Sequence, residues 1–347
     1  MAKKIKVLIV DDSAVSREVM NRGISLDPYI EVVATAADPF EARDKILKYK
    51  PDVMICDIEM PKMNGIEFVR QLLPQYPIPV IMVTAVSEAV FDAINAGAVD
   101  FVTKPNTQSS QNIKGFIMEL TEKIKIANNS NISEAKANIL SSVVSTGQKH
   151  INTRQIIAIG ASTGGTEAIY NLLKSLPVNV PGIVITQHIP PVFSNMFAER
   201  LNNFTHFTVK EAETGDYVEQ GKVLVAPGDQ HMKIRRVGNR YKVICFEGER
   251  VSGHCPSVDV LFESVAEEAG ECAVGIILTG MGCDGAKGLF SMREKGARTI
   301  GQDEKSSVIY GMPRAAFNIG AVEKQLSLVD IPKMLCALCS SQVCKSD

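Results

Sequence analysis

The chain has 347 residues, of which 22% are charged, and its formal net charge is -2 at pH 7. This length favours two domains over one, since a single hydrophobic core rarely grows beyond about 250–300 residues. This net charge gives no electrostatic footprint for nucleic-acid binding, and no uninterrupted apolar run reaches the roughly 18–20 residues that span a bilayer. The start, MAKKIKVLIVDDS, reaches two aspartates too early for a signal peptide, so a cytoplasmic location is expected.

The first third of the chain alternates short apolar runs with amphipathic stretches. Such alternation with fully apolar strands predicts a doubly wound, mainly parallel α/β sheet with helices on both faces. The expected strands are 5–10, 31–34, 52–56, 79–83 and 99–102, and the expected helices are 14–26, 38–48, 65–73, 88–96 and 111–126.

A polar, Ser/Asn-rich stretch separates two domains of this kind. It has no sustained apolar period and is interpreted as a linker. The predicted organisation is therefore a first domain at 1–126, a linker at 127–153 and a second domain at 154–347.

The second domain resumes the same alternation and is also expected to be a doubly wound, mainly parallel sheet. Turn signals between period-two runs at 207–246 predict β-hairpins inserted into it. The other expected strands are 155–160, 182–187, 273–278 and 298–301, and the expected helices are 165–175, 192–202, 257–269, 285–295, 312–318 and 330–340.

Reactive side chains follow the strands of the first domain. Asp11, Asp12 and Asp57 come at strand ends, where parallel strands gather along one edge of a sheet. Carboxylates grouped in this way can hold Mg²⁺, and one can accept a phosphoryl group as an aspartyl phosphate. Asp57 is the expected acceptor, with Thr84 and Lys104 placed to bind the phosphoryl oxygens. Any one of these residues alone is more simply explained as a helix cap or a loop residue. The five residues together favour a phosphate-accepting site.

The first domain resembles the response-regulator receiver domain over residues 5–122. The likeness rests on these residues and on Met60-Pro61, Asn64-Gly65 and Lys104-Pro105. It implies that a histidine kinase phosphorylates Asp57 and that the Glu59 backbone carbonyl completes a Mg²⁺ shell with Asp11, Asp12 and Asp57. Phe101 falls where many receivers place a tyrosine that moves inward on phosphorylation.

The second domain carries a different set of strand-end residues. Ser162 lies in a glycine-rich turn between an expected strand and helix, and this fragment also satisfies the GxSxG pattern. Such a turn more often binds phosphate or merely turns the chain, and a lone histidine is more often structural. His188, however, ends the next strand, where a general base is required, and Asp284 follows a third strand, where it can orient the imidazole. Backbone N–H groups at Thr163 and Met281 are expected to form an oxyanion hole.

The chain order Ser, His, Asp differs from that of α/β-hydrolases. The second domain resembles the catalytic domain of chemotaxis protein-glutamate methylesterases over about residues 154–340. One departure is Cys255, where relatives commonly carry arginine. The likeness rests on Gly160 to Gly165, Gln187-His188, Pro227-Gly228, His231-Met232, Pro256 to Phe262, Thr279 to Gly285, Gln302-Asp303-Glu304 and Gly311-Met312-Pro313.

The two resemblances together imply a phosphorylation-activated methylesterase. It would hydrolyse γ-glutamyl methyl esters on chemoreceptors, release methanol and also deamidate receptor glutamines. The receiver would cover the crevice near Ser162 until Asp57 is phosphorylated. The competing interpretation is a phosphorylation-controlled binding module that keeps the fold without turnover; a DNA-binding response regulator is disfavoured because no helix-turn-helix with a basic reading helix follows the linker.

Three cysteines lie close together near the end of the chain, at Cys336, Cys339 and Cys344. They lack a nearby histidine or fourth cysteine, so ordinary free thiols are favoured there over a zinc site. No cofactor is expected for the esterase.

Overall fold

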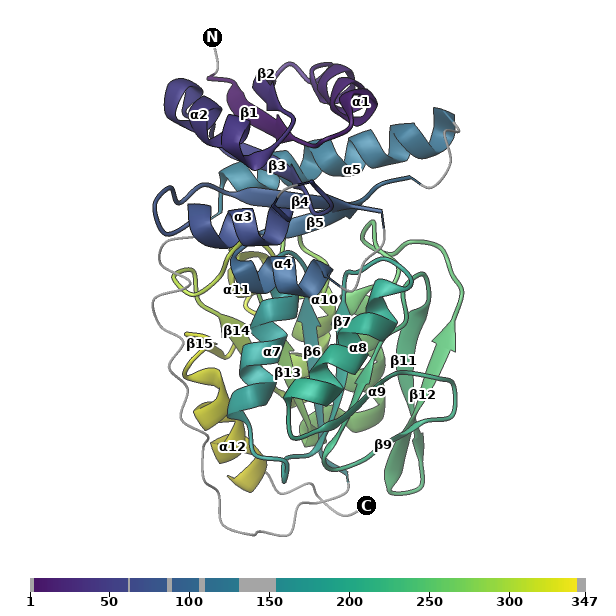
Figure 1. The fold of residues 1–347 in the computed structure, drawn as a ribbon. Helices are drawn as coiled ribbons and strands as arrows, with labels where there is room; N and C mark the ends of the chain where they lie inside the picture. Colours follow the sequence, from purple (N-terminus) through teal and green to yellow (C-terminus); the bar gives the residue numbers. More distant parts are fainter. Residues whose placement is uncertain (1–2, 62, 86–88, 106–109, 131–153, 342–347) are drawn as a thin grey trace. The chain divides into compact units, whose positions relative to one another are not determined.

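A computed structural model of the chain describes residues 3–61, 63–85, 89–105, 110–130 and 154–341 (Figure 1). The chain forms two compact units, Met1–Ser133 and Glu134–Asp347. Most of the predicted linker, 127–153, lies outside the described residues. Within them, no helix is both long and apolar enough to cross a membrane.

The N-terminal unit is a five-stranded parallel sheet in the order β2-β1-β3-β4-β5. Every residue of β3 and β4 is buried, because helices cover both faces of the sheet. This confirms the predicted doubly wound fold. The strands are β1 (Ile5–Val10), β2 (Ile30–Ala36), β3 (Val53–Asp57), β4 (Val80–Thr84) and β5 (Asp100–Thr103), and the helices are α1 (Ala14–Ile24), α2 (Pro39–Tyr49), α3 (Gly65–Leu72), α4 (Val90–Ala96) and α5 (Ser110–Asn128).

The C-terminal unit contains a seven-stranded parallel sheet in the order β15-β14-β13-β6-β7-β10-β8. Its central strands are fully buried, which again explains their uninterrupted apolar sequences. The strands are β6 (Ile156–Ala161), β7 (Gly182–Gln187), β8 (Thr208–Glu211), β10 (Lys222–Val225), β13 (Ala273–Ile277), β14 (Arg298–Gln302) and β15 (Lys324–Leu326). The short edge strand β15 was not predicted from the sequence.

A small antiparallel sheet, in the order β11-β12-β9, lies at one side of this unit (Figure 1). Strands β11 (His231–Val237) and β12 (Arg240–Phe246) form the predicted hairpin around Gly238-Asn239. The other predicted hairpin is wrong, because β8 and β10 run parallel to each other and join the main sheet. The chain between them crosses to the small sheet, where β9 (Tyr217–Val218) pairs with β12. A half-buried edge strand alternates in the same way as a hairpin strand, so the pattern did not distinguish the two.

The helices of the C-terminal unit are α7 (Gly165–Ser175), α8 (Phe193–Phe204), α9 (Val258–Ala269), α10 (Ala286–Glu294), α11 (Met312–Asn318) and α12 (Ile331–Ser341), with a 3₁₀ turn at Gly270–Cys272. Helix α9 is central to the core, since its apolar face contributes the fully buried Val258, Leu261 and Phe262. Ser257 caps its N-terminus by accepting from the Val260 N–H. The packing of α9 therefore fixes where its first turn lies.

Candidate functional site

The register of the main sheet brings Ser162 and His188 to neighbouring positions. Strands β6 and β7 are paired so that Ala161 is opposite Gln187, and each candidate residue is the next one along its strand. The His188 N–H also donates to the Ala161 carbonyl at 3.1 Å. The two side chains therefore leave adjacent strand ends at the carboxyl edge of the sheet, as predicted.

His188 contacts the third candidate, Asp284, directly. The distance between His188 Nε2 and Asp284 Oδ2 is 2.7 Å, and both side chains are largely buried, at 8% and 1% exposure. An ionised carboxylate only accepts hydrogen bonds, so Nε2 carries the proton in this pair. The other nitrogen, Nδ1, is buried and makes no hydrogen bond within the described residues. Its lone pair is therefore available to take a proton.

Asp284 is held at the N-terminus of α9. Its Oδ1 accepts from the Ser257 hydroxyl at 2.8 Å and from the Asp259 N–H at 3.0 Å, and its Oδ2 accepts from the Val258 N–H at 2.8 Å. Burial opposes ionisation of this carboxyl, but the bond and charge of His188 and these backbone N–H groups lower the pKa of Asp284 below its usual value. The first turn of α9 thus keeps Asp284 ionised.

Ser257 is itself positioned by a buried histidine. Its N–H donates to His231 Nδ1 at 3.3 Å, and His231 Nε2 contacts the Glu249 carbonyl at 2.8 Å. Sequence reasoning did not assign a role to either residue. The available signal was the N-cap serine of the Pro-Ser-Val-Asp segment, since it places a helix N-terminus where an acidic side chain can bind.

His254 was also missed as a neighbour of the site. Its ring stacks on that of His188, with centroids 3.7 Å apart and planes at 11°. Burial, followed by the charge of His188, lowers the pKa of His254 to about 4. The ring is therefore uncharged near neutral pH and packs flat against the His188 imidazole.

The turn that carries Ser162 is closely packed. Gly164 has φ +76, and a Cβ there would lie 2.7 Å from Val308 Cβ, so both conformation and space require glycine. Gly280 lies against the serine, since a Cβ on it would come within 2.7 Å of Ser162 Cβ. The side-chain amide of Gln187 donates to the Ser162 carbonyl at 2.9 Å. These contacts fix the backbone from which the hydroxyl projects.

The candidate oxyanion donors lie on two loops beside the serine. The Ser162 N–H donates to the Thr279 carbonyl at 3.0 Å, which joins the loop after β6 to the loop after β13. Thr163 is 7% exposed and its carbonyl accepts from the Thr279 hydroxyl at 3.0 Å. Met281 is 48% exposed, and its backbone N–H donates no hydrogen bond within the described residues.

The N-terminal unit brings its predicted carboxylates together. One ligand oxygen from each of Asp11, Asp12 and Asp57 lies within 4.8 Å of the others, an arrangement typical of a Mg²⁺ site. Lys104 Nζ lies 2.7 Å from Asp57 Oδ2 and 2.9 Å from Asp11 Oδ2. Burial raises the pKa of Asp57, which Lys104 opposes. Burial by itself would lower the pKa of Lys104, but its bonds to both aspartates raise it.

The remaining residues predicted for this unit occupy neighbouring strand ends. Thr84 ends β4, and its hydroxyl is buried without a hydrogen-bond partner in the described residues. Phe101 on β5 is buried, with Lys123 Nζ 5.3 Å from its ring centroid. A backbone hydrogen bond from Glu59 reaches the Asp57 carboxylate; the role of the Glu59 carbonyl as a metal ligand stays a prediction.

Comparisons with known proteins agree with both halves of this geometry. The CheB methylesterase family matches residues 157–335, and the response regulator receiver domain matches residues 7–113. The chain belongs to the CheB methylesterase family. A protein-glutamate methylesterase/protein-glutamine glutaminase of Syntrophomonas wolfei is 56% identical over 326 residues, covering 94% of this chain and 95% of the relative.

More distant members of the family are similar over almost the whole chain. The protein of the same description from Salmonella typhimurium is 44% identical over 342 residues, covering 97% of this chain and 98% of the relative. The crystal structure of the Thermotoga maritima CheB methylesterase catalytic domain is 35% identical, with a TM-score of 0.52, and it covers 53% of this chain and 98% of that one. The predicted family, two-domain α/β fold and enzyme class are confirmed by these matches.

Two cysteines of the C-terminal cluster lie within the described residues. Cys336 and Cys339 lie on α12 as free thiols, and Cys344 lies outside the described residues. Cys255, beside His254, is also free.

Proposed function

We propose that this family member is a phosphorylation-activated protein-glutamate methylesterase that acts on chemoreceptors and also deamidates receptor glutamines. The observation that carries the proposal is the contact of His188 Nε2 with Asp284, which leaves a buried Nδ1 without a hydrogen bond among the described residues, on the strand next to that of Ser162. The curated relatives carry both activities in their names. The buried carboxylate-imidazole pair supplies the base that each activity requires.

In the proposed reaction Ser162 is the nucleophile. His188 Nδ1 takes the hydroxyl proton while Oγ attacks the ester carbonyl carbon, and Asp284 stabilises the resulting imidazolium. The oxyanion is held by backbone N–H groups, with Met281 as the candidate donor and Thr163 as the second. The carbon–methoxy bond then breaks, and His188 returns the proton to the leaving oxygen as methanol.

Water completes the turnover. His188 removes a proton from water as its oxygen attacks the acyl carbon, and the bond to Ser162 Oγ breaks as the serine regains a proton. The products are a glutamate side chain and free enzyme. With a glutamine substrate, the same steps release ammonia in place of methanol.

Asp57 is the proposed phosphoryl acceptor of the receiver unit, and its partner would be a histidine kinase. Asp11, Asp12 and Asp57 would hold Mg²⁺, with the Glu59 carbonyl as a further ligand, and the ion would neutralise charge on the incoming phosphoryl group. Lys104 and the Thr84 hydroxyl, which has no hydrogen-bond partner in the described part of the chain, are the proposed groups for phosphoryl oxygens. Phosphorylation is proposed to shift a population in which the receiver restricts access to Ser162.

The test is methanol release from methylated receptor membranes, measured with and without a small-molecule phosphodonor and Mg²⁺. Ser162→Ala should abolish release while Asp57 remains able to take phosphate, and Asp57→Asn should keep only the unstimulated rate. A serine-reactive phosphonate should label Ser162 in the wild-type chain. Near-normal methanol release by Ser162→Ala would refute the assignment, and retained receptor binding without turnover in the wild type would indicate a binding module instead.

A further inference from the structure

The antiparallel sheet has one buried face and one open face. Along β11 the residues Met232 and Ile234 point into the core, whereas Lys233, Arg235 and Val237 alternate with them and are exposed. Residues opposite each other in antiparallel strands share a face. The exposed residues of β11 are therefore joined on the open face by their partners on β12.

This open face is basic. In register, Lys233 pairs with Ile244, Arg235 with Lys242, and Val237 with Arg240. We call these six residues the basic face. The face has four cations. One of them, Arg240, lies 3.5 Å from Glu219, and this is the only ion pair between the face and a carboxylate of the described residues.

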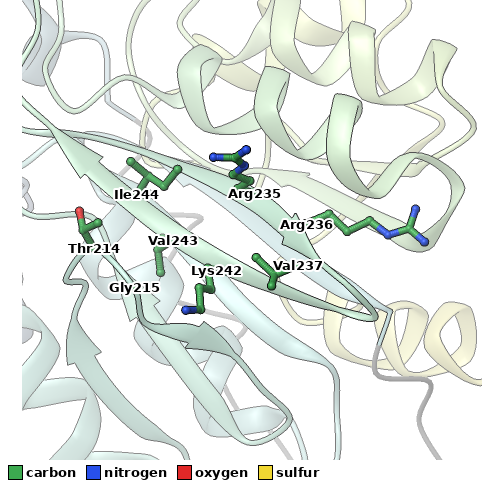
Figure 2. A pocket seen from close by; sticks show the side chains of 8 residues that line it. All are labelled: Thr214, Gly215, Arg235, Arg236, Val237, Lys242, Val243 and Ile244. Atoms are coloured by element: carbon green, nitrogen blue, oxygen red, sulfur yellow. The ribbon is translucent and has the colours of Figure 1, made fainter.

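A pocket lies along β11 and β12 and is lined in part by the basic face, through Arg235, Val237, Lys242 and Ile244 (Figure 2). The cavity has a volume of about 370 Å³ and is lined by Thr214, Gly215, Arg235, Arg236, Val237, Lys242, Val243 and Ile244. Three of these residues are cationic, β-branched side chains supply apolar surface, and no carboxylate lines the hollow. A cavity of this composition suits a segment in which an apolar side chain has acidic neighbours.

Three of the cations have no acidic partner in the described part of the chain. Lys233 Nζ lies 4.6 Å from the ring centroid of Phe246, and Lys242 Nζ lies 4.6 Å from that of Tyr217. Within the described residues, Arg235 contacts neither a carboxylate nor an aromatic ring. The rings orient the ammonium groups but do not neutralise them, so the positive charge stays available.

The β11 edge of the small sheet is closed to strand addition. The Ile234 N–H donates to the Ser264 hydroxyl at 3.0 Å, and the Arg236 N–H donates to Glu268 at 2.8 Å, so residues of α9 occupy the outer edge of β11. A partner is therefore expected on the face and not on the edge.

We propose that the basic face binds an acidic segment of a protein partner. Carboxylates of the segment would pair with Lys233, Arg235 and Lys242, and a neighbouring apolar side chain would enter the hollow beside Val237 and Ile244. Charge complementarity carries this choice, since Lys233, Arg235 and Lys242 have no acidic partner within the described residues, and Arg235 and Lys242 line the pocket beside Val237 and Ile244. The inference does not depend on the esterase chemistry.

Two other classes of macromolecule fit the face less well. Single-stranded nucleic acid requires open aromatic faces for base stacking, but Tyr217 and Phe246 are covered by cations. A membrane surface requires a broad apolar area for insertion, whereas Val237, 45% exposed, is the one large apolar side chain of the basic face that is highly exposed.

Fluorescence anisotropy with the full-length chain tests the proposal. The probe is a labelled synthetic peptide that alternates glutamates with leucines, and the matched peptide carries glutamine in place of glutamate. The glutamate peptide should bind, and the triple variant Lys233→Gln/Arg235→Gln/Lys242→Gln should weaken its Kd by about tenfold or more. Raising NaCl from about 50 to about 300 mM should weaken binding severalfold in the wild type and much less in this variant.

A matched variant controls for net charge. Lys295→Gln/Lys305→Gln/Lys324→Gln removes the same charge from exposed positions of the same unit and should bind the peptide like the wild type. Both variants should melt within a few degrees of the wild type. Equal Kd values for the two triple variants would overturn the proposal, and so would equal affinity for the glutamine peptide. Tighter binding of single-stranded poly(U) or of anionic phosphatidylserine vesicles than of the peptide would assign the face to a different partner.

Discussion

Replacement of Ser257 by alanine tests whether the first turn of α9 supports catalysis through Asp284. The substitution removes the hydroxyl that donates to Asp284 Oδ1 at 2.8 Å and leaves the two backbone donors, Val258 and Asp259, in place. One hydrogen bond to a charged group contributes about 1.5–3 kcal/mol. Since about 1.4 kcal/mol corresponds to a factor of ten in rate, kcat for methanol release should fall roughly 10- to 100-fold.

The pH profile separates this effect from a general loss of structure. Asp284 has a lowered pKa because donors stabilise its ionised form, and loss of one donor should raise that pKa. The ionised form is present above the pKa and is lost as pH falls through it. The acid limb of the rate profile should therefore move to higher pH in Ser257→Ala.

Stability provides the matched control. Ser257 also caps α9, so its loss should cost about 1 kcal/mol of the free energy of unfolding. Ser264→Ala removes a hydroxyl from the same helix without touching Asp284 and should lower stability with little change in kcat. Ser257→Thr, which keeps a hydroxyl, should recover most of the rate. A kcat for Ser257→Ala within twofold of wild type, with an unmoved acid limb, would show that the backbone donors suffice.

Gly280→Ala should reduce kcat by about tenfold or more in a folded chain, because the added Cβ would lie 2.7 Å from Ser162 Cβ and displace the nucleophile; an unchanged rate would contradict that contact. His254 has a folded pKa of about 4, below its unfolded value of 6.5, so it contributes stability above pH 6.5 that is lost progressively as pH falls towards 4. His254→Phe keeps the stack on His188 without this titration, and the melting temperature of the variant should fall less than that of the wild type between pH 7 and pH 5. EDTA should block phosphorylation of Asp57 by a small-molecule phosphodonor, measured as phosphate incorporation. The unstimulated rate of methanol release should stay unchanged, and a rate that falls with EDTA would place a metal in the esterase site.

Local sequence patterns were sufficient for the five-stranded sheet and for strands β14, β13, β6 and β7 of the seven-stranded sheet. Fully apolar runs such as 156–161 and 273–277 became buried central strands, since only a strand covered on both faces has no polar alternation. Because parallel strands end at a common edge, the residues that follow them could be grouped from the order of the strands along the chain. The family and the enzyme class were expected from the resemblance of these residues and their motifs to known families, and the comparisons confirmed both.

The sequence pattern failed to predict strand pairing where two different arrangements share the same alternation of apolar and polar residues. The segment 207–229 alternates like a hairpin, but β8 and β10 lie parallel in the main sheet, and the turn at Gly215 is attached to β12 through the Val243 carbonyl. Which neighbour a half-buried strand pairs with depends on long-range packing. The alternation of its own side chains does not encode that choice.

The sequence by itself determined which side chains stand at the strand ends, because apolar runs and glycine-rich turns are local properties. Only the tertiary structure decided how those side chains meet. Nε2 of His188 faces Asp284, and Nδ1 makes no hydrogen bond within the described residues; the first turn of α9 holds the carboxylate, and His254 covers the imidazole. Each of these contacts joins segments distant in the chain, so each depends on tertiary packing, which no local pattern specifies.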